Sequence, residues 1–140
     1  MTFIRIVVAG TPLLAKLEWE AAPETCEVFN QLLPLRSEIK QARWSGEALW
    51  IPMGQVRYSI KTERHKHAPF PGELLFYSGS ESETEILVPY GQTRFGCARG
   101  PLYGNHFATI VDSDELLRKV AELTWGAGTQ EIAIDVVKPK

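Results

Sequence analysis

Two short stretches of the chain carry side chains suited to acid–base chemistry on a small ligand. In the first, Glu47 follows a Trp-Ser-Gly turn and begins an apolar stretch. A carboxylate at such a position is partly removed from water, which raises its pKa and suits it to exchange a proton. We therefore expect Glu47 to be catalytic and Trp44 to form a wall on which a ligand stacks. The alternative for Glu47 is a solvated acid at a strand end.

The second stretch is a glycine-rich segment that leads into a histidine. His106 stands at the entry to a predicted strand, and histidine is the side chain that titrates near neutral pH. We expect His106 to share general acid–base catalysis with Glu47, unless a backbone carbonyl satisfies its ring. A guanidinium beside aromatic rings in the same segment suits a carboxylate or a planar polar ligand. The expected ligand-binding residues here are Tyr90, Arg94, Phe95, Tyr103 and Asn105.

Other chemistries lack the residues that they need. His65 and His67 share one face if their segment is a strand, but no third ligand accompanies them, so we predict no metal site. Cys26 and Cys97 have no CxxC or Cys/His spacing, and we expect buried thiols rather than a disulfide. The sequence contains no GxGxxG, GxxxxGK[ST] or GxSxG motif. We therefore predict no bound nucleotide and no cofactor.

Composition narrows the class of protein. The chain has 140 residues, 44% of them hydrophobic and 23% charged, which fits one globular domain over residues 1–140. A net charge of −2 provides no positive field to attract nucleic acid. Arg5, Gly10 and Lys16 interrupt the apolar N-terminal stretch. Because no stretch reaches the length of a membrane span, we expect no membrane association and a cytoplasmic location.

Hydrophobic periodicity places the candidate residues on a mainly β framework. Helical spacing predicts one helix from Pro23 to the stop at Pro34, and another from a capping box at Asp112 and Glu115 to a point before Gly126. Strands and helices do not alternate regularly, which favours an α+β, mainly β domain built as a closed barrel. Alternation and β-branched residues predict strands over residues 2–9, 13–19, 35–42, 47–51, 73–77, 85–89, 106–111 and 130–137.

The longest predicted loop spans residues 52–72 and is named the basic arm here. Between residues 57 and 66 it carries four basic side chains against one acid, Glu63. Long excursions from a compact domain serve function or assembly. The arm complements the acidic run Glu81, Glu83 and Glu85 in charge, and we expect the two to meet within the barrel or across a subunit boundary. A homo-oligomer is therefore expected.

Three local motifs together resemble an uncharacterised bacterial family of cyclophilin-like fold. They are W-S-G-E at 44–47, P-G-E-L-L-F-Y at 71–77, and the run from P-Y-G at 89–91 to G-N-H-F-A-T at 104–109. The similarity extends from about residue 2 to residue 136. It implies a closed β-barrel with two short helices, related in shape to cyclophilins and to small barrel modules of amide-hydrolysing complexes. It implies no known reaction, because a fold does not fix a function.

Three functional hypotheses follow. The first is a small-molecule-binding barrel that serves as a metabolic enzyme or accessory subunit and takes a polar or carboxylate ligand. The second is an oligomeric protein-interaction module without catalysis, whose tryptophans fill packed core positions. The third, peptidyl-prolyl isomerase activity, comes from the resemblance and from Arg94 beside Phe95, but the F-x-M-Q-G-G run of cyclophilins is missing. Whether the protein is an enzyme stays open at this point.

Overall fold

The computed structural model describes residues 2–79 and 81–138. Most of their regular structure is β, with one helix between the second and third strands and another before the last. The helices are α1 (Pro23–Gln31) and α2 (Asp114–Ala127). The strands are β1 (Phe3–Val8), β2 (Thr11–Leu17), β3 (Leu35–Gln41), β4 (Gly46–Pro52), β5 (His65–Lys66), β6 (Glu73–Tyr77), β7 (Glu85–Thr93), β8 (Gly96–Cys97), β9 (Gly100–Pro101), β10 (Gly104–Ile110) and β11 (Thr129–Val136).

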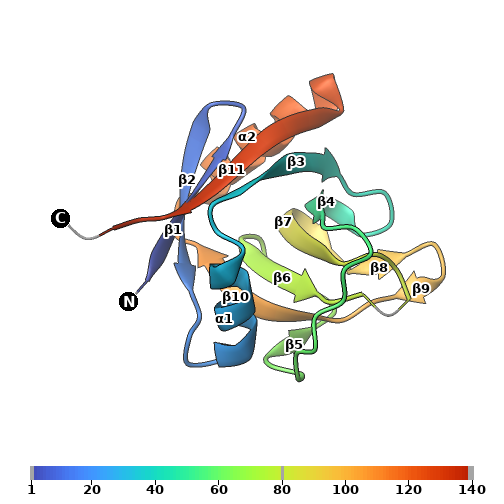
Figure 1. Cartoon of the computed structure of the whole chain (residues 1–140). Helices are drawn as coiled ribbons and strands as arrows, with labels where there is room; N and C mark the ends of the chain where they lie inside the picture. Colours follow the sequence, from blue (N-terminus) through green and yellow to red (C-terminus); the bar gives the residue numbers. More distant parts are fainter. Residues whose placement is uncertain (1, 80, 139–140) are drawn as a thin grey trace.

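Eight antiparallel strands of the described chain close into a barrel. Their order is β2, β1, β11, β3, β4, β7, β6 and β10, and β10 pairs back to β2 with Ala108 opposite Leu17. Closure removes the free sheet edges that an open sheet would expose. The short strand β5 adds to β10, and β8 and β9 form a separate hairpin. The predicted closed barrel with two helices is confirmed (Figure 1).

Both helices contribute apolar side chains to the core of the barrel. Phe29 of α1 packs against Phe107 of β10 with 4.8 Å between the ring centroids. Leu117 and Val120 of α2 are each 1% exposed and belong to the same apolar cluster. Figure 1 shows α1 beside β10 and α2 behind β11. Because the helices fill the barrel with apolar side chains, its interior is a packed core.

A second apolar cluster lies on the outer face of β4, β7 and β6. The segment 94–103, which includes the β8–β9 hairpin, covers this face, so these strands are buried on both sides. Successive side chains of a strand point to opposite faces, and outward-facing Leu87 therefore places Glu85 on the same covered face. The buried members of the cluster are Ala48, Leu75, Tyr77, Leu87, Phe95 and Leu102.

The course of β7 differs from the prediction. The strand runs to Thr93 and so includes Tyr90, which we expected in a glycine-rich turn. A register shift between Gly46 and Ala48 of β4 lets the pairing with β7 continue to Thr93. Pairing with β4 overrides the turn tendency of the local sequence in this part of β7.

The ends of α2 also differ from the prediction. Ser113, rather than Asp112, is the N-cap, and its hydroxyl accepts a hydrogen bond from the Leu116 amide. The Asp112 carboxylate instead accepts a hydrogen bond from the Leu14 amide of β2. The helix continues through Gly126 to Ala127, since a glycine costs a helix only about 1 kcal/mol.

Acidic partners within the chain hold the basic arm. Lys66 lies 2.9 Å from Glu73, and Arg64 lies 3.7 Å from Glu18. The ion pairs of the arm found in the described residues do not involve the acidic run. Polar contacts with that segment include Arg57 Nη1 donating to the Ser82 carbonyl, and the Met53 amide donating to the Thr84 carbonyl at 2.8 Å. Within the described chain, the predicted ion pairing between the arm and the acidic run is therefore wrong, since other carboxylates take these cations. Pairing across a subunit boundary stays a prediction.

Candidate functional site

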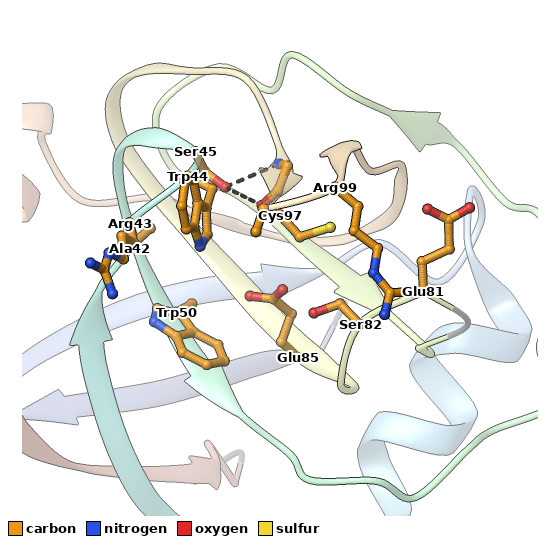
Figure 2. Close-up of a pocket in the computed structure, with 12 residues that line it drawn as sticks. Ala42, Arg43, Trp44, Ser45, Trp50, Glu81, Ser82, Glu85, Cys97 and Arg99 are labelled. Atoms are coloured by element: carbon orange, nitrogen blue, oxygen red, sulfur yellow. Dashed lines mark hydrogen bonds between the residues drawn. The ribbon is translucent and has the colours of Figure 1, made fainter.

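A pocket of about 300 Å³ lies between the outer face of β4 and β7 and the covering segment 94–103. We call it the Glu85 pocket. Trp50 comes from β4, Glu85 from the start of β7, Cys97 from β8, and Trp44 from the turn before β4. Figure 2 shows the Glu85 carboxyl group pointing into the space between the two indoles, Ser82 and Cys97. Strands from three places in the sequence thus build one concave site.

Glu85 is the acidic group at the centre of this pocket. Its residue is only 7% exposed, and burial raises its pKa to about 8, with a smaller contribution from the negative charge of Glu83. Among the described residues, no hydrogen bond or ion pair engages its carboxyl group. A buried carboxyl group without a partner is costly, and in a pocket it marks a candidate functional site.

The turn that carries Trp44 is fixed rigidly to the wall opposite. The buried Ser45 hydroxyl accepts a hydrogen bond from the Gly96 amide at 3.1 Å and lies 3.3 Å from the Gly96 carbonyl (Figure 2). The Arg94 amide donates to the Ser45 carbonyl at 3.1 Å. These bonds tie the β3–β4 turn to the covering segment. They hold Trp44 and Cys97 on facing sides of the Glu85 pocket.

Two guanidinium groups and a thiol lie at the margin of the pocket. Arg43 and Arg99 are exposed, and the Arg43 guanidinium lies over the Trp44 ring at 5.6 Å from its centroid. The Cys97 thiol is half-buried, whereas the Cys26 thiol is buried and burial raises its pKa to about 12. The expectation of two buried thiols holds for Cys26 alone.

Glu47 lies in a neighbouring groove of about 710 Å³, which shares Trp44 and Ser45 with the Glu85 pocket. Its carboxylate accepts hydrogen bonds from the Gln92 amide at 2.9 Å and from Arg118 at 3.3 Å. These donors hold the pKa of Glu47 below its usual value. The predicted upward shift is wrong, because the side chain is hydrogen-bonded and solvated instead of desolvated.

The groove brings together three residues that the sequence analysis selected. Trp44, Glu47 and the exposed Arg94 all line it. Gly46 makes this approach possible, because its φ is +83° and a Cβ there would lie 2.7 Å from the Gln92 carbonyl oxygen. The groove thus contains the exposed Arg94 side chain, and its carboxylate, Glu47, pairs with Arg118 at 3.3 Å.

His106 lies elsewhere and lines neither the Glu85 pocket nor the groove that contains Glu47. It is 3% exposed on β10, where burial lowers its pKa against the opposing effect of Glu73. Thr109 donates to Glu18 at 2.6 Å, so its oxygen accepts from His106 Nε2 at 2.7 Å. The buried Nδ1 faces Glu73 at 3.8 Å without a hydrogen bond. The structure does not bring His106 and Glu47 into one cavity.

Tyr90 and Phe95 are core residues rather than pocket walls. Tyr90 is 4% exposed, and its hydroxyl accepts hydrogen bonds from Gln41 at 2.7 Å and from Trp125 at 3.2 Å. Phe95 is fully buried and packs edge-on against Tyr77. Because Phe95 points into the core, it does not present a joint surface with Arg94.

Asn105 and Tyr103 serve the basic arm. The Asn105 amide donates to Thr25 and to the Lys61 carbonyl, each at 3.0 Å, and its oxygen accepts from the Glu63 amide. The Glu63 carboxylate in turn accepts three hydrogen bonds at the start of α1. Asn105 is thus an anchor for the arm. Tyr103 is exposed and contacts the rings of His65 and His67, each at 5.2 Å.

The sequence does not single out Glu85 and Trp50 as site residues, because Glu85 belongs to an acidic run and Trp50 fits a core position. The available signal was the two-residue spacing from Glu85 to Leu87 in a strand that is apolar on both faces. That spacing places Glu85 and Leu87 on the same face of the strand. Only the tertiary structure shows that the segment 94–103 covers this face.

Comparison with known families and structures fits this architecture. Residues 4–136 match the model of the DUF3830 family, whose description is "protein of unknown function". The chain belongs to this family. No curated protein sequence is significantly similar to it. DUF3830 membership agrees with the resemblance to a family of unknown function with a cyclophilin-like fold.

Solved structures with similar folds include three of different kinds. The structure of McbB in complex with tryptophan has a TM-score of 0.73 and 22% identity over 94% of this chain, which spans only 44% of McbB. The hypothetical protein AF2241 from Archaeoglobus fulgidus has a TM-score of 0.61 and 20% identity, with 96% and 93% covered. A cyclophilin-type peptidyl-prolyl isomerase from Cryptosporidium parvum has a TM-score of 0.57 and 14% identity, with 99% of both chains covered. These likenesses establish the cyclophilin-like fold.

Two further properties follow for the described part of the DUF3830 chain. Neither helix is long and apolar enough to cross a bilayer. Across residues 2–79 and 81–138, no three His, Cys, Asp or Glu side chains gather as a metal site. The ring of His67 lies 3.1 Å from the Leu102 carbonyl instead.

Proposed function

We propose that this DUF3830 protein binds a small polar molecule in the Glu85 pocket and acts as a metabolic enzyme or accessory subunit. The observation that carries the proposal is the Glu85 carboxyl group, which is buried, faces the pocket and has no partner among the described residues. Two indoles provide the flat walls that a ring-containing ligand needs. A volume of about 300 Å³ suits a molecule of one or two rings.

The proposed ligand site, the Glu85 pocket, lies beside the groove that contains Glu47, where the sequence led us to expect the ligand. Trp44 belongs to both cavities, but Glu85 and Trp50 replace Glu47 and His106 as the groups that meet the ligand. The McbB structure was solved in complex with tryptophan, a small molecule with an indole ring and an amine. This complex supports a small-molecule ligand for the present chain.

A thermal-shift screen tests the proposal. Purified protein is heated with small amines, carboxylates, amides and heterocycles, and hits are repeated with Glu85→Gln and with Glu47→Gln as the matched control. Since a ligand that binds only the native state raises its stability, a true ligand shifts the melting temperature in proportion to the logarithm of its concentration. The shift should vanish in Glu85→Gln and persist in Glu47→Gln. The reverse pattern would assign the ligand to the neighbouring groove and contradict the proposal.

Catalysis by Glu85 is a second candidate. A carboxyl group whose pKa is about 8 holds its proton at neutral pH and can donate it to a ligand atom, as a general acid does. The test is the pH dependence of turnover for any hit that is consumed. Activity that falls as the pH rises through about 8 supports a general acid, and activity independent of pH over this range excludes it.

An oligomeric interaction module is the remaining alternative. Phe70 of the basic arm is 74% exposed beside the groove that Trp44 lines, and such aromatic surface is typical of contact sites. Light scattering of the wild type and of Phe70→Ser tests it. A mass that falls from oligomer to monomer in Phe70→Ser supports the module, and a monomeric wild type excludes it.

A further inference from the structure

The fold places the Glu85 carboxyl group among two indoles, Ser82 and Cys97, and no Lys or Arg side chain of the described residues forms an ion pair with it. Arg43 and Arg99 line the same pocket, yet both are exposed and neither forms an ion pair with Glu85. Arg43 instead lies over the face of Trp44. When the Glu85 carboxyl group is ionised, no cation of the described chain balances its charge. A positively charged ligand group is the partner that would balance it.

The surroundings of Glu85 favour such a cation. The faces of indole rings attract cations, and the pocket places two of them beside one carboxyl group. Glu81, at the same pocket, adds negative charge at its edge. The titratable and charged groups near Glu85 on the neighbouring elements are Arg43 of the β3–β4 turn, Tyr77 of β6, Glu81 and Glu83 of the preceding loop, and Cys97 and Arg99 of the covering segment. Arg57 of the basic arm reaches the same loop, where it donates to the Ser82 carbonyl.

We infer that the Glu85 pocket recognises ligands that carry a protonated amine, which pairs with the Glu85 carboxylate and lies against the rings of Trp44 and Trp50. The inference rests on the proposed small-molecule site and names the chemical class that it takes. A charge-assisted hydrogen bond from an ammonium group to a carboxylate is among the stronger contacts that a small ligand can make. Neutral and anionic ligands of equal size lack it.

Binding of an ammonium group must be linked to a proton. In the free protein at pH 7 the carboxyl group is neutral, because its pKa is about 8. Pairing with an ammonium group requires the carboxylate, so Glu85 gives its proton to the solvent as the ion pair forms. Below this pKa, the affinity for a permanently protonated amine therefore rises about tenfold for each pH unit. Neutral ligands show no such rise.

Titration calorimetry with three probes of matched size tests the inference. Benzylamine, benzamide and benzoate differ in charge but share one ring. Each is titrated into the full chain at pH 6 and pH 7, in buffers of different ionisation enthalpy, so that released protons are counted. We expect benzylamine to bind about tenfold more tightly at pH 7 than at pH 6 and to release close to one proton. Benzamide and benzoate should bind at least tenfold more weakly.

Two variants locate the effect. Glu85→Gln should weaken benzylamine binding at least tenfold and abolish the proton release, whereas Glu83→Gln, a nearby half-buried acid that does not line the pocket, should change the affinity less than twofold. Thermal unfolding of each variant confirms that it is folded. If benzamide or benzoate binds through Glu85 as tightly as benzylamine, the amine class is overturned and the small-molecule site stands. If no probe binds, the amine class is overturned, and the wider ligand screen decides the site.

Discussion

Replacing Glu85 by glutamine should change how the stability of the protein depends on pH. In the unfolded chain Glu85 has its ordinary pKa of 4.5, and in the folded chain burial raises the pKa to about 8. Between these values the folded state keeps a proton that the unfolded state has lost. The wild type therefore loses stability as the pH rises, by about 1.4 kcal/mol per unit for this group. Glutamine does not titrate, so the variant avoids this loss.

The size of the effect follows from the pKa shift. The whole shift corresponds to about 5 kcal/mol, and water that reaches the carboxylate through the pocket lowers this cost. We expect the free energy of unfolding of Glu85→Gln, minus that of the wild type, to grow by about 2–5 kcal/mol from pH 5 to pH 8. Above about pH 9 the difference should stay constant, because the carboxyl group is then ionised in both states.

Urea unfolding followed by tryptophan fluorescence measures this difference at each pH. The Glu47→Gln variant is the control: the pKa of Glu47 is lowered, so the group is ionised in both states above pH 5 and its substitution gives a difference that does not change with pH. Other titrating groups cancel when a variant is compared with the wild type at the same pH. A flat difference for Glu85→Gln would refute the buried, neutral carboxyl group on which the site rests.

Three further predictions concern the framework around the site. Gly46→Ala should lower the free energy of unfolding by about 2–4 kcal/mol, and Gly10→Ala by about 1 kcal/mol. Both glycines have a φ of +83°, but only at Gly46 would the added Cβ meet a carbonyl oxygen. Equal losses would contradict this close approach. Asn105→Ala should cost about 1–3 kcal/mol and speed tryptic cleavage of the basic arm, and an unchanged cleavage rate would contradict its role as an anchor. A thiol reagent should modify Cys97 in the native protein and Cys26 only after unfolding, whereas equal rates would contradict the burial of Cys26.

The fold could be predicted from the sequence to a large extent because its signals are local. Alternation in β1 and β11 and the helical spacing in α2 each depend on neighbouring residues. Where the prediction was wrong, a tertiary contact decided the outcome. Asp112 was expected to cap α2, but the Leu14 amide of β2 takes its carboxylate, and the adjacent Ser113 caps the helix instead.

The candidate site was predicted only in part, since side chains of the same local character met different surroundings. Glu47 and Glu85 both stand at the start of an apolar strand. Glu47 meets the Gln92 amide and Arg118, which lower its pKa, whereas Glu85 is enclosed beneath the segment 94–103, which raises its pKa. The sequence does not show which carboxylate is covered.

By itself the sequence determined the mainly β domain, the two helices and the resemblance to a cyclophilin-like family. Only the tertiary structure decided which acid is desolvated and which is paired. The physical reason is that a pKa depends on every charge, dipole and solvent molecule around a group, and closure of the barrel brings Trp50, Glu85 and Cys97 together from distant parts of the chain.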